Sequence, residues 1–173
     1  MSHQLNDPFV DAKEVVYKFL KNPLDGSRNM VVDGSSTPVS FRYTAPQATR
    51  VVLSRINIII LDASIGTSNF GGLAAPLTTG VAFFIKDVND NLLVDLCDGF
   101  PVQENWEFAA LAGADWTIAP ATDALTIRWT FEKSGKRIIL EPGEYFEMLI
   151  QDAMAGLVAM DAMVQGYQYP LTV

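Results

Sequence analysis

The sequence predicts an all-β protein, an antiparallel β-sandwich or jelly roll. Two observations predict it: several segments alternate apolar and polar residues with a period of two, and turn-forming residues separate these segments at short intervals. The chain has 173 residues, 49% of them apolar, which suits one domain with one packed core. We expect an extended or partly helical N-terminal arm over residues 1–13 and a single jelly-roll domain over residues 14–173.

The clearest predicted strand covers residues 125–131. Its apolar side chains alternate with threonine and arginine, so one face should be buried and the other solvated, as in an antiparallel sheet. The inward-facing set is Leu125, Ile127, Trp129 and Phe131. Residues 39–43 alternate in the same way and predict another strand.

Further segments complete the predicted sandwich. Residues 51–61 are β-branched and largely apolar on both faces, which is typical of a central strand. Residues 81–86 and 92–97 flank the turn composition of residues 87–91 and predict a hairpin. Residues 144–151 and 157–169 flank residues 152–156 and predict a second hairpin, whose return strand places the following side chains on one face: Val158, Met160, Ala162 and Val164.

The N-terminal stretch allows two interpretations. Asp7-Pro8 suits the start of a helix. Against this, Val15, Tyr17 and Phe19 alternate and favour β-structure. We expect a strand over residues 14–20.

Charge and composition argue against several functional classes. The formal net charge is −8 and the basic residues are scattered, which disfavours binding to nucleic acid or to an anionic membrane. No apolar run approaches the ~18–20 residues of a membrane helix. The first residues lack the basic and apolar regions of a signal peptide, so we expect synthesis in a cytoplasm without secretion. The single cysteine, Cys97, precludes an intramolecular disulfide and a thiolate metal site.

No residue pattern predicts catalysis or a cofactor. A nucleophile–histidine pair would depend on His3, the one histidine, in a terminal segment. Glutamates cluster around Pro142-Gly143 and around Trp106, but they form no unique acid–base pair, and Glu147, between two apolar neighbours, should point to solvent. We therefore expect no enzymatic activity.

A calcium loop is the one metal alternative. Asp87, Asn89 and Asn91 have the spacing of the first ligands of such a loop. Leu92 stands at the sixth position, where the EF-hand loop requires glycine, and a strand follows instead of a helix. We expect a plain hairpin turn and no metal.

Two long loops, residues 63–79 and 99–124, and the N-terminal arm are the expected interaction regions. Apolar side chains among glycine, alanine and proline would face water on a free monomer and suit contact with a neighbour. The two loop tryptophans either close one end of the sandwich or meet a partner. The candidate interface residues are Leu5, Phe9, Val10, Phe70, Leu73, Leu77, Trp106 and Trp116.

A series of short motifs carries a family resemblance. In chain order they are Asp33-Gly34-Ser35-Ser36-Thr37-Pro38-Val39-Ser40-Phe41, Arg55-Ile56-Asn57, Phe70-Gly71-Gly72-Leu73, Leu77-Thr78-Thr79-Gly80, Asn105-Trp106, Arg128-Trp129-Thr130-Phe131 with Lys133-Ser134-Gly135, Gln151-Asp152 to Gly156-Leu157, and Gln165-Gly166-Tyr167. In this order, over residues 31–169, the sequence resembles the jelly-roll virion proteins of tailed bacteriophages. The resemblance implies a cement, decoration or accessory component of the particle, which binds other subunits and has no catalytic residues.

The expected function is therefore that of a capsid cement or decoration protein. It would be assembled in the host cytoplasm, would form a dimer or trimer, and would contact other virion proteins, the major capsid protein first among them. Two alternatives stay open: a tail, neck or host-binding component, and a carbohydrate-binding or hydrolytic β-sandwich. An exposed row of planar aromatic side chains with polar neighbours would favour the last of these.

Overall fold

The computed structural model describes residues 14–63, 70–96, 114–119, 123–130 and 137–171, and these form β-strands and no helix. This confirms the predicted all-β class. The strands are β1 (Glu14–Phe19), β2 (Val39–Thr44), β3 (Thr49–Leu61), β4 (Val81–Lys86), β5 (Leu92–Asp95), β6 (Ala114–Ala119), β7 (Ala124–Thr130), β8 (Ile138–Leu140), β9 (Tyr145–Ile150) and β10 (Ala159–Pro170). No helix among the described residues is long and apolar enough to cross a membrane.

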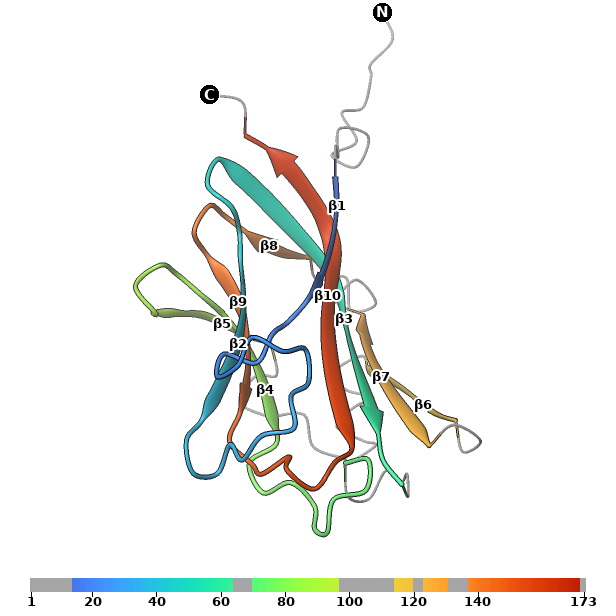
Figure 1. Ribbon diagram of the computed structural model, residues 1–173. Helices are drawn as coiled ribbons and strands as arrows, with labels where there is room; N and C mark the ends of the chain where they lie inside the picture. The colour runs from blue at the N-terminus through green and yellow to red at the C-terminus, as the bar shows by residue number, and fades with distance from the viewer. Residues whose placement is uncertain (1–13, 64–69, 97–113, 120–122, 131–136, 172–173) are drawn as a thin grey trace, which may run out of the picture.

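The strands form two antiparallel sheets that face one another (Figure 1). The larger sheet has the order β1-β10-β3-β7-β6, and β8 extends it by pairing with β3 beside β7. The smaller sheet has the order β2-β9-β4-β5. β3 is thus a central strand, as its two apolar faces predict, while β2 and β5 are the edges of the four-stranded sheet.

The pairing is nested, as in a jelly roll. β1 pairs with β10, β2 with β9, β3 with β7 and β4 with β5, all antiparallel. This is the pattern of one long hairpin rolled up on itself, so that alternate strand pairs fall in alternate sheets. The start of β1 and the end of β10 consequently lie at the same end of the sandwich (Figure 1).

The core lies between the two sheets and follows the predicted alternation. Leu125, Ile127 and Trp129 of β7 are buried, which confirms the assigned register. The Trp129 ring meets Phe83 of the opposite sheet edge to face, with ring centroids 4.8 Å apart. Each sheet therefore buries its apolar face against the other.

One predicted hairpin is wrong. Both of its strands exist, as β9 and β10, but β9 belongs to the four-stranded sheet and β10 to the six-stranded sheet. The turn composition of residues 151–158 suits a link between sheets as well as a hairpin, and the local sequence does not distinguish the two. Asp152 holds a neighbouring loop instead of closing a hairpin, as described below.

The N-terminal segment is a strand, as predicted, and not a helix. β1 forms an edge of the larger sheet by pairing with β10. Val16 faces the core, whereas Tyr17 is mainly exposed. The expected arm over residues 1–13 lies outside the described residues.

Candidate interaction surface on the four-stranded sheet

A buried carboxylate stands at the centre of the outer face of the four-stranded sheet. In β9, Phe146 and Met148 face the core, so the alternating Glu147 faces outward. The strand register places Arg42 of β2 and Phe84 of β4 on either side of it. Glu147 is only 1% exposed, so the prediction that it points to solvent is wrong. Side chains of the neighbouring strands β2 and β4 contact its carboxylate, which the chain neighbours of Glu147 alone do not reveal.

Two cations and a hydroxyl hold the carboxylate of Glu147. Arg42 Nε lies 3.2 Å from Oε1, the Ser40 hydroxyl donates to the same oxygen, and the Lys86 ammonium forms an ion pair with Oε2. Burial raises the pKa of Glu147, but the Lys86 and Ser40 hydrogen bonds and the charges of Lys86 and Arg42 outweigh it and lower the pKa overall. Glu147 is therefore held ionised, unlike the protonated carboxyl that glycoside hydrolysis needs as general acid.

The charged cluster extends to the β4–β5 turn. Arg42 Nη1 lies 3.1 Å from Asp90 Oδ1, and the Tyr145 hydroxyl donates to the same oxygen. The Arg42 guanidinium also lies over the Tyr145 ring, 4.5 Å from its centroid. Burial, with the hydrogen bond to Asp90, raises the pKa of Tyr145, so this hydroxyl stays protonated. Through these contacts the cluster connects β2, β4 and β9 on the outer side of the sheet.

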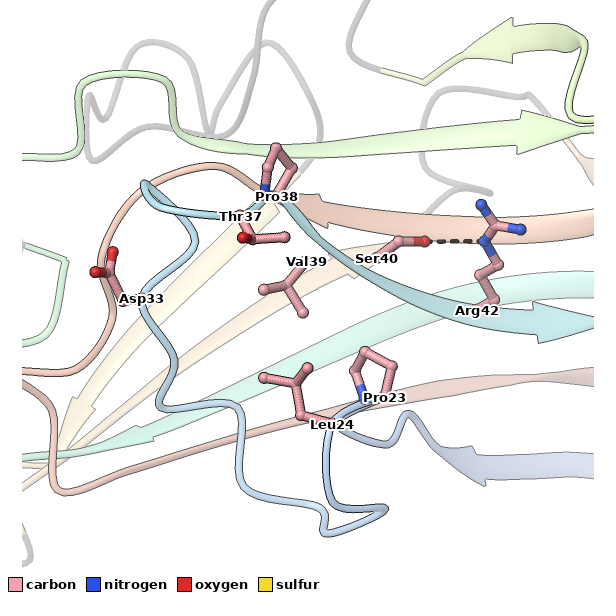
Figure 2. A pocket seen from close by; sticks show the side chains of 8 residues that line it. All are labelled: Pro23, Leu24, Asp33, Thr37, Pro38, Val39, Ser40 and Arg42. Atoms are coloured by element: carbon pink, nitrogen blue, oxygen red, sulfur yellow. Dashed lines mark hydrogen bonds between the residues drawn. The ribbon is translucent and has the colours of Figure 1, made fainter.

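A groove of about 660 Å³ runs beside this cluster, along the free edge of β2 (Figure 2). Figure 2 shows Pro23 and Leu24 on one side and Val39 of β2 on the other, with the Ser40–Arg42 hydrogen bond at one end. The lining residues are Pro23, Leu24, Asp33, Thr37, Pro38, Val39, Ser40 and Arg42. Half of these residues are polar, but most of the surface that they expose in the groove is apolar, so the groove suits an apolar or extended segment more than a highly charged ligand.

A local turn creates one wall of the groove. The buried Asn22 accepts the Leu24 N–H on its side-chain oxygen, at 2.9 Å, and its carbonyl accepts the N–H of Gly26 at 2.8 Å. Gly26 has a φ of 72°, a left-handed conformation that glycine adopts without strain. The turn leaves Leu24 77% exposed beside β2. This wall is therefore fixed by Asn22 and Gly26 and not by the core.

The opposite edge of the sheet, β5, is apolar and exposed. Leu92, Leu93 and Val94 are each about half exposed, and Val88 in the preceding turn is 75% exposed. The β4–β5 hairpin, confirmed as predicted, projects to the left of the sandwich in Figure 1, beyond the strands of the other sheet. Among the described strands, β5 pairs with β4 alone, and exposed apolar edges of this kind favour association.

In the loop that was expected to supply an interface, the described residues 70–79 place their large apolar side chains in the core. Phe70, Leu73 and Leu77 are 0%, 7% and 7% exposed, so the prediction that they face solvent is wrong. Ala74, Ala75 and Pro76 between them are exposed and line a second, smaller depression of about 400 Å³. The loop folds its large side chains under itself and caps one end of the sandwich, which removes the apolar surface that the sequence implied.

Asp152 fixes this loop. Its carboxylate accepts the backbone N–H groups of Thr78, Thr79 and Gly80 at 2.7–2.9 Å. At the same end, Gly34 approaches β9 so closely that a Cβ atom there would lie 2.7 Å from the Ile150 carbonyl oxygen. Several motifs that carry the family resemblance thus meet at one end of the fold, where they have structural roles.

The remaining predicted interface residues fall largely outside the described part of the chain. Leu5, Phe9, Val10 and Trp106 lie outside the described residues, as do Cys97 and Phe131. Trp116 belongs to β6, and the structure does not describe its side chain. Their role in an interface stays a prediction.

The acidic turn after β4 uses its carboxylate for its own backbone. Asp87 Oδ1 accepts the N–H groups of Asn89 and Asn91, and Oδ2 accepts the Asn91 side-chain amide. These hydrogen bonds, led by those from Asn91, lower the pKa of Asp87. Within the described ranges, no group of three or more acidic, histidine or cysteine side chains is placed to hold a metal ion.

Sequence reasoning missed the cluster around Glu147 and the exposure of β5. The polar positions of β2, β4 and β9 were visible as alternation, but Arg42 and Glu147 are 105 positions apart and their pairing is set by topology. The one available signal in the sequence was that the outward positions of these three strands carry charges of opposite sign. No protein-family model matches the chain, and no curated protein is similar enough to count as a relative.

Proposed function

We propose that this chain is a non-enzymatic structural subunit of a tailed-bacteriophage particle, a capsid cement or decoration protein that acts through protein–protein contacts. The observation that carries the proposal is the exposed apolar edge strand β5, at the end of a sheet whose charged groups are paired with one another. On an isolated monomer such an edge favours non-specific association, whereas in an assembly a neighbouring subunit covers it.

Two further features support the proposal. The nested strand order is that of a jelly roll, the fold that the motif resemblance implies. The carboxylate at the centre of the outer face is held ionised between Lys86 and Arg42, so it serves to lock the sheet rather than to transfer protons. A sheet with an exposed apolar edge strand suits a subunit that binds neighbours.

The carbohydrate-binding alternative gains little from the described residues. Among them, Tyr17 on β1 is the large aromatic residue that is mainly exposed, and one ring does not make a platform. The alternative of a tail, neck or host-binding component shares the virion location, and copy number per particle distinguishes a tail or neck position from a capsid position.

Quantitative mass spectrometry of purified particles tests the proposal. We expect the chain in every particle preparation, at a ratio to the major capsid protein that corresponds to a lattice position. A copy number of about a dozen or fewer per particle would favour a tail or neck position, consistent with closed ring symmetry. Absence of the chain from intact particles, with abundant chain in the soluble fraction of the same lysate, would contradict a virion role.

A further inference from the structure

We infer that Asp25-Gly26 is a site of spontaneous covalent modification, at which the aspartate isomerises to isoaspartate, and that the fold protects Asp33-Gly34 from the same reaction. The inference is independent of the proposed function. It rests on a comparison within one chain, because Asp-Gly-Ser occurs at residues 25–27 and again at residues 33–35. The chemistry of the two segments is the same, and only their surroundings differ.

The reaction needs an aspartate, a following residue without a bulky side chain, and water. The amide nitrogen of the glycine attacks Cγ of the neutral aspartic acid, so that an N–Cγ bond forms and the carboxyl hydroxyl leaves with the amide proton as water. Glycine favours this step because no Cβ atom hinders the approach. Water then opens the five-membered imide. Opening at the former main-chain carbonyl gives isoaspartate, whose backbone runs through Cβ and Cγ, with no net change in composition.

The surroundings of Asp25-Gly26 permit the reaction. Both residues are exposed, and a Cβ atom added at Gly26 would meet no atom within 4 Å. The Gly26 N–H donates to the Asn22 carbonyl at 2.8 Å. Asp25 Oδ1 accepts the Ser27 N–H, also at 2.8 Å. Both hydrogen bonds lie within one surface turn, so the reactive conformation requires only a local opening of that turn.

The surroundings of Asp33-Gly34 oppose the reaction. Gly34 is buried, and a Cβ atom there would lie 2.7 Å from the Ile150 carbonyl oxygen and 2.8 Å from that of Asp152. The Gly34 N–H donates to the Asp152 carbonyl. Asp33 also forms a β-bridge with Ala153. The same opening here must separate this segment from the link between β9 and β10, which costs more than opening one turn.

Isomerisation at Asp25 would change one wall of the groove beside β2. It inserts one extra backbone atom into a turn whose shape depends on the hydrogen bonds from Leu24 and Gly26 to Asn22. This turn carries Leu24, which lines the groove and is 77% exposed. The modification therefore alters the groove and leaves the packing between the two sheets as it is.

Incubation of the full chain in mildly acidic buffer, followed by tryptic peptide mapping, tests the inference. The Ser27 N–H lowers the pKa of Asp25 and the Ser35 hydroxyl lowers that of Asp33, so acid is needed to populate the neutral form of both carboxyls. Trypsin separates the two pairs into the peptides 22–28 and 29–42. Electron-transfer dissociation then distinguishes isoaspartate from aspartate in each peptide, although their masses are equal.

We expect isoaspartate to accumulate in peptide 22–28 about tenfold or more faster than in peptide 29–42. Equal rates in the two peptides, a faster reaction at Asp33, or no isoaspartate at Asp25 would overturn the inference.

Two controls separate the fold from the sequence. In urea at the same pH the contacts of Gly34 are lost, and the two rates should agree within about threefold. A tenfold difference that persists in urea would assign the preference to the flanking residues Leu24 and Val32, against the inference. Asp25→Glu keeps the charge but would require a less favourable six-membered ring, so its peptide 22–28 should show no isomer. An isomer of this peptide in Asp25→Glu would place the reaction at another residue.

Discussion

Single residues on the outer sheet face show how a charge can be buried in a β-sandwich. Glu147 loses contact with water but gains two cations and a hydroxyl, which offset the cost of its desolvation. Alternation in the sequence correctly predicts that Glu147 faces away from the core. It does not predict that neighbours from β2 and β4 cover it, because that depends on pairing between distant segments.

Glu147→Gln should destabilise the fold and weaken its dependence on acid pH. The pKa of Glu147 is lowered in the folded state, so its contribution is complete above the ordinary value of 4.5 and is lost as pH falls through the folded-state pKa. At neutral pH we expect a loss of about 1–3 kcal/mol, because Lys86 and Arg42 lose a charged partner but keep access to solvent. Urea denaturation of both proteins from pH 3 to 7 measures the free energy of unfolding and its dependence on pH.

Asp161→Asn is the control for this charge change. It removes one negative charge on β10, in the other sheet, and should leave the pH dependence of the free energy of unfolding near that of the wild type. Equal acid sensitivity of the wild type and Glu147→Gln would show that the Glu147 cluster contributes nothing to stability.

At the scale of elements, strand existence was predictable and strand pairing was not. β2, β3, β4, β5 and β7 follow directly from periodicity and turn composition. The separation of β9 and β10 into different sheets does not, since a link between sheets and a hairpin turn have similar composition. The burial of Phe70 was also hidden, because a loop rich in glycine and alanine shows no periodicity.

β10 contains a close approach that tests the observed pairing. Its register with β3 shifts between Gln165 and Gly166, and a Cβ atom at Gly166 would lie 2.0 Å from the Val52 carbonyl oxygen. Gly166→Ala must therefore move backbone, and we expect a loss of more than about 3 kcal/mol in chemical denaturation. At Gly156 the nearest contact is the flexible end of Leu73, at 3.3 Å, so Gly156→Ala should cost less than about 1 kcal/mol. Similar losses in both variants would contradict the close β3–β10 contact.

At the scale of the whole molecule, one core joins the two sheets, and the contact between Trp129 and Phe83 spans it. Composition and length predicted this single core, and the inward register of Trp129 was predicted from local alternation. The particular partner, Phe83, was beyond prediction because it lies on the opposite sheet. The place of the large exposed apolar side chains near the four-stranded sheet was also missed: they lie on β5 and beside β2, whereas those in the described part of the glycine-rich loop are buried.

Trp129→Ala should destabilise both sheets together. Removing a buried large aromatic side chain costs about 3–5 kcal/mol. Far-ultraviolet circular dichroism and hydrogen exchange of β4 and β7 amides should report one common transition, at a lower denaturant midpoint than in the wild type. Thr126→Ala, on the other face of β7, should shift that midpoint only slightly. Separate transitions for β4 and β7 would contradict a shared core.

The nested pairing also has a consequence for protein synthesis. β1, β2 and β3 leave the ribosome long before β10, β9 and β7, with which they pair. β10 lies between β1 and β3, so the larger sheet stays divided until residue 159 and those after it have been translated. A nascent chain therefore carries unpaired apolar strands for most of its translation, and folding depends on contacts of long sequence separation. Chains that terminate before β10 should be substrates for chaperones and proteases rather than smaller stable domains.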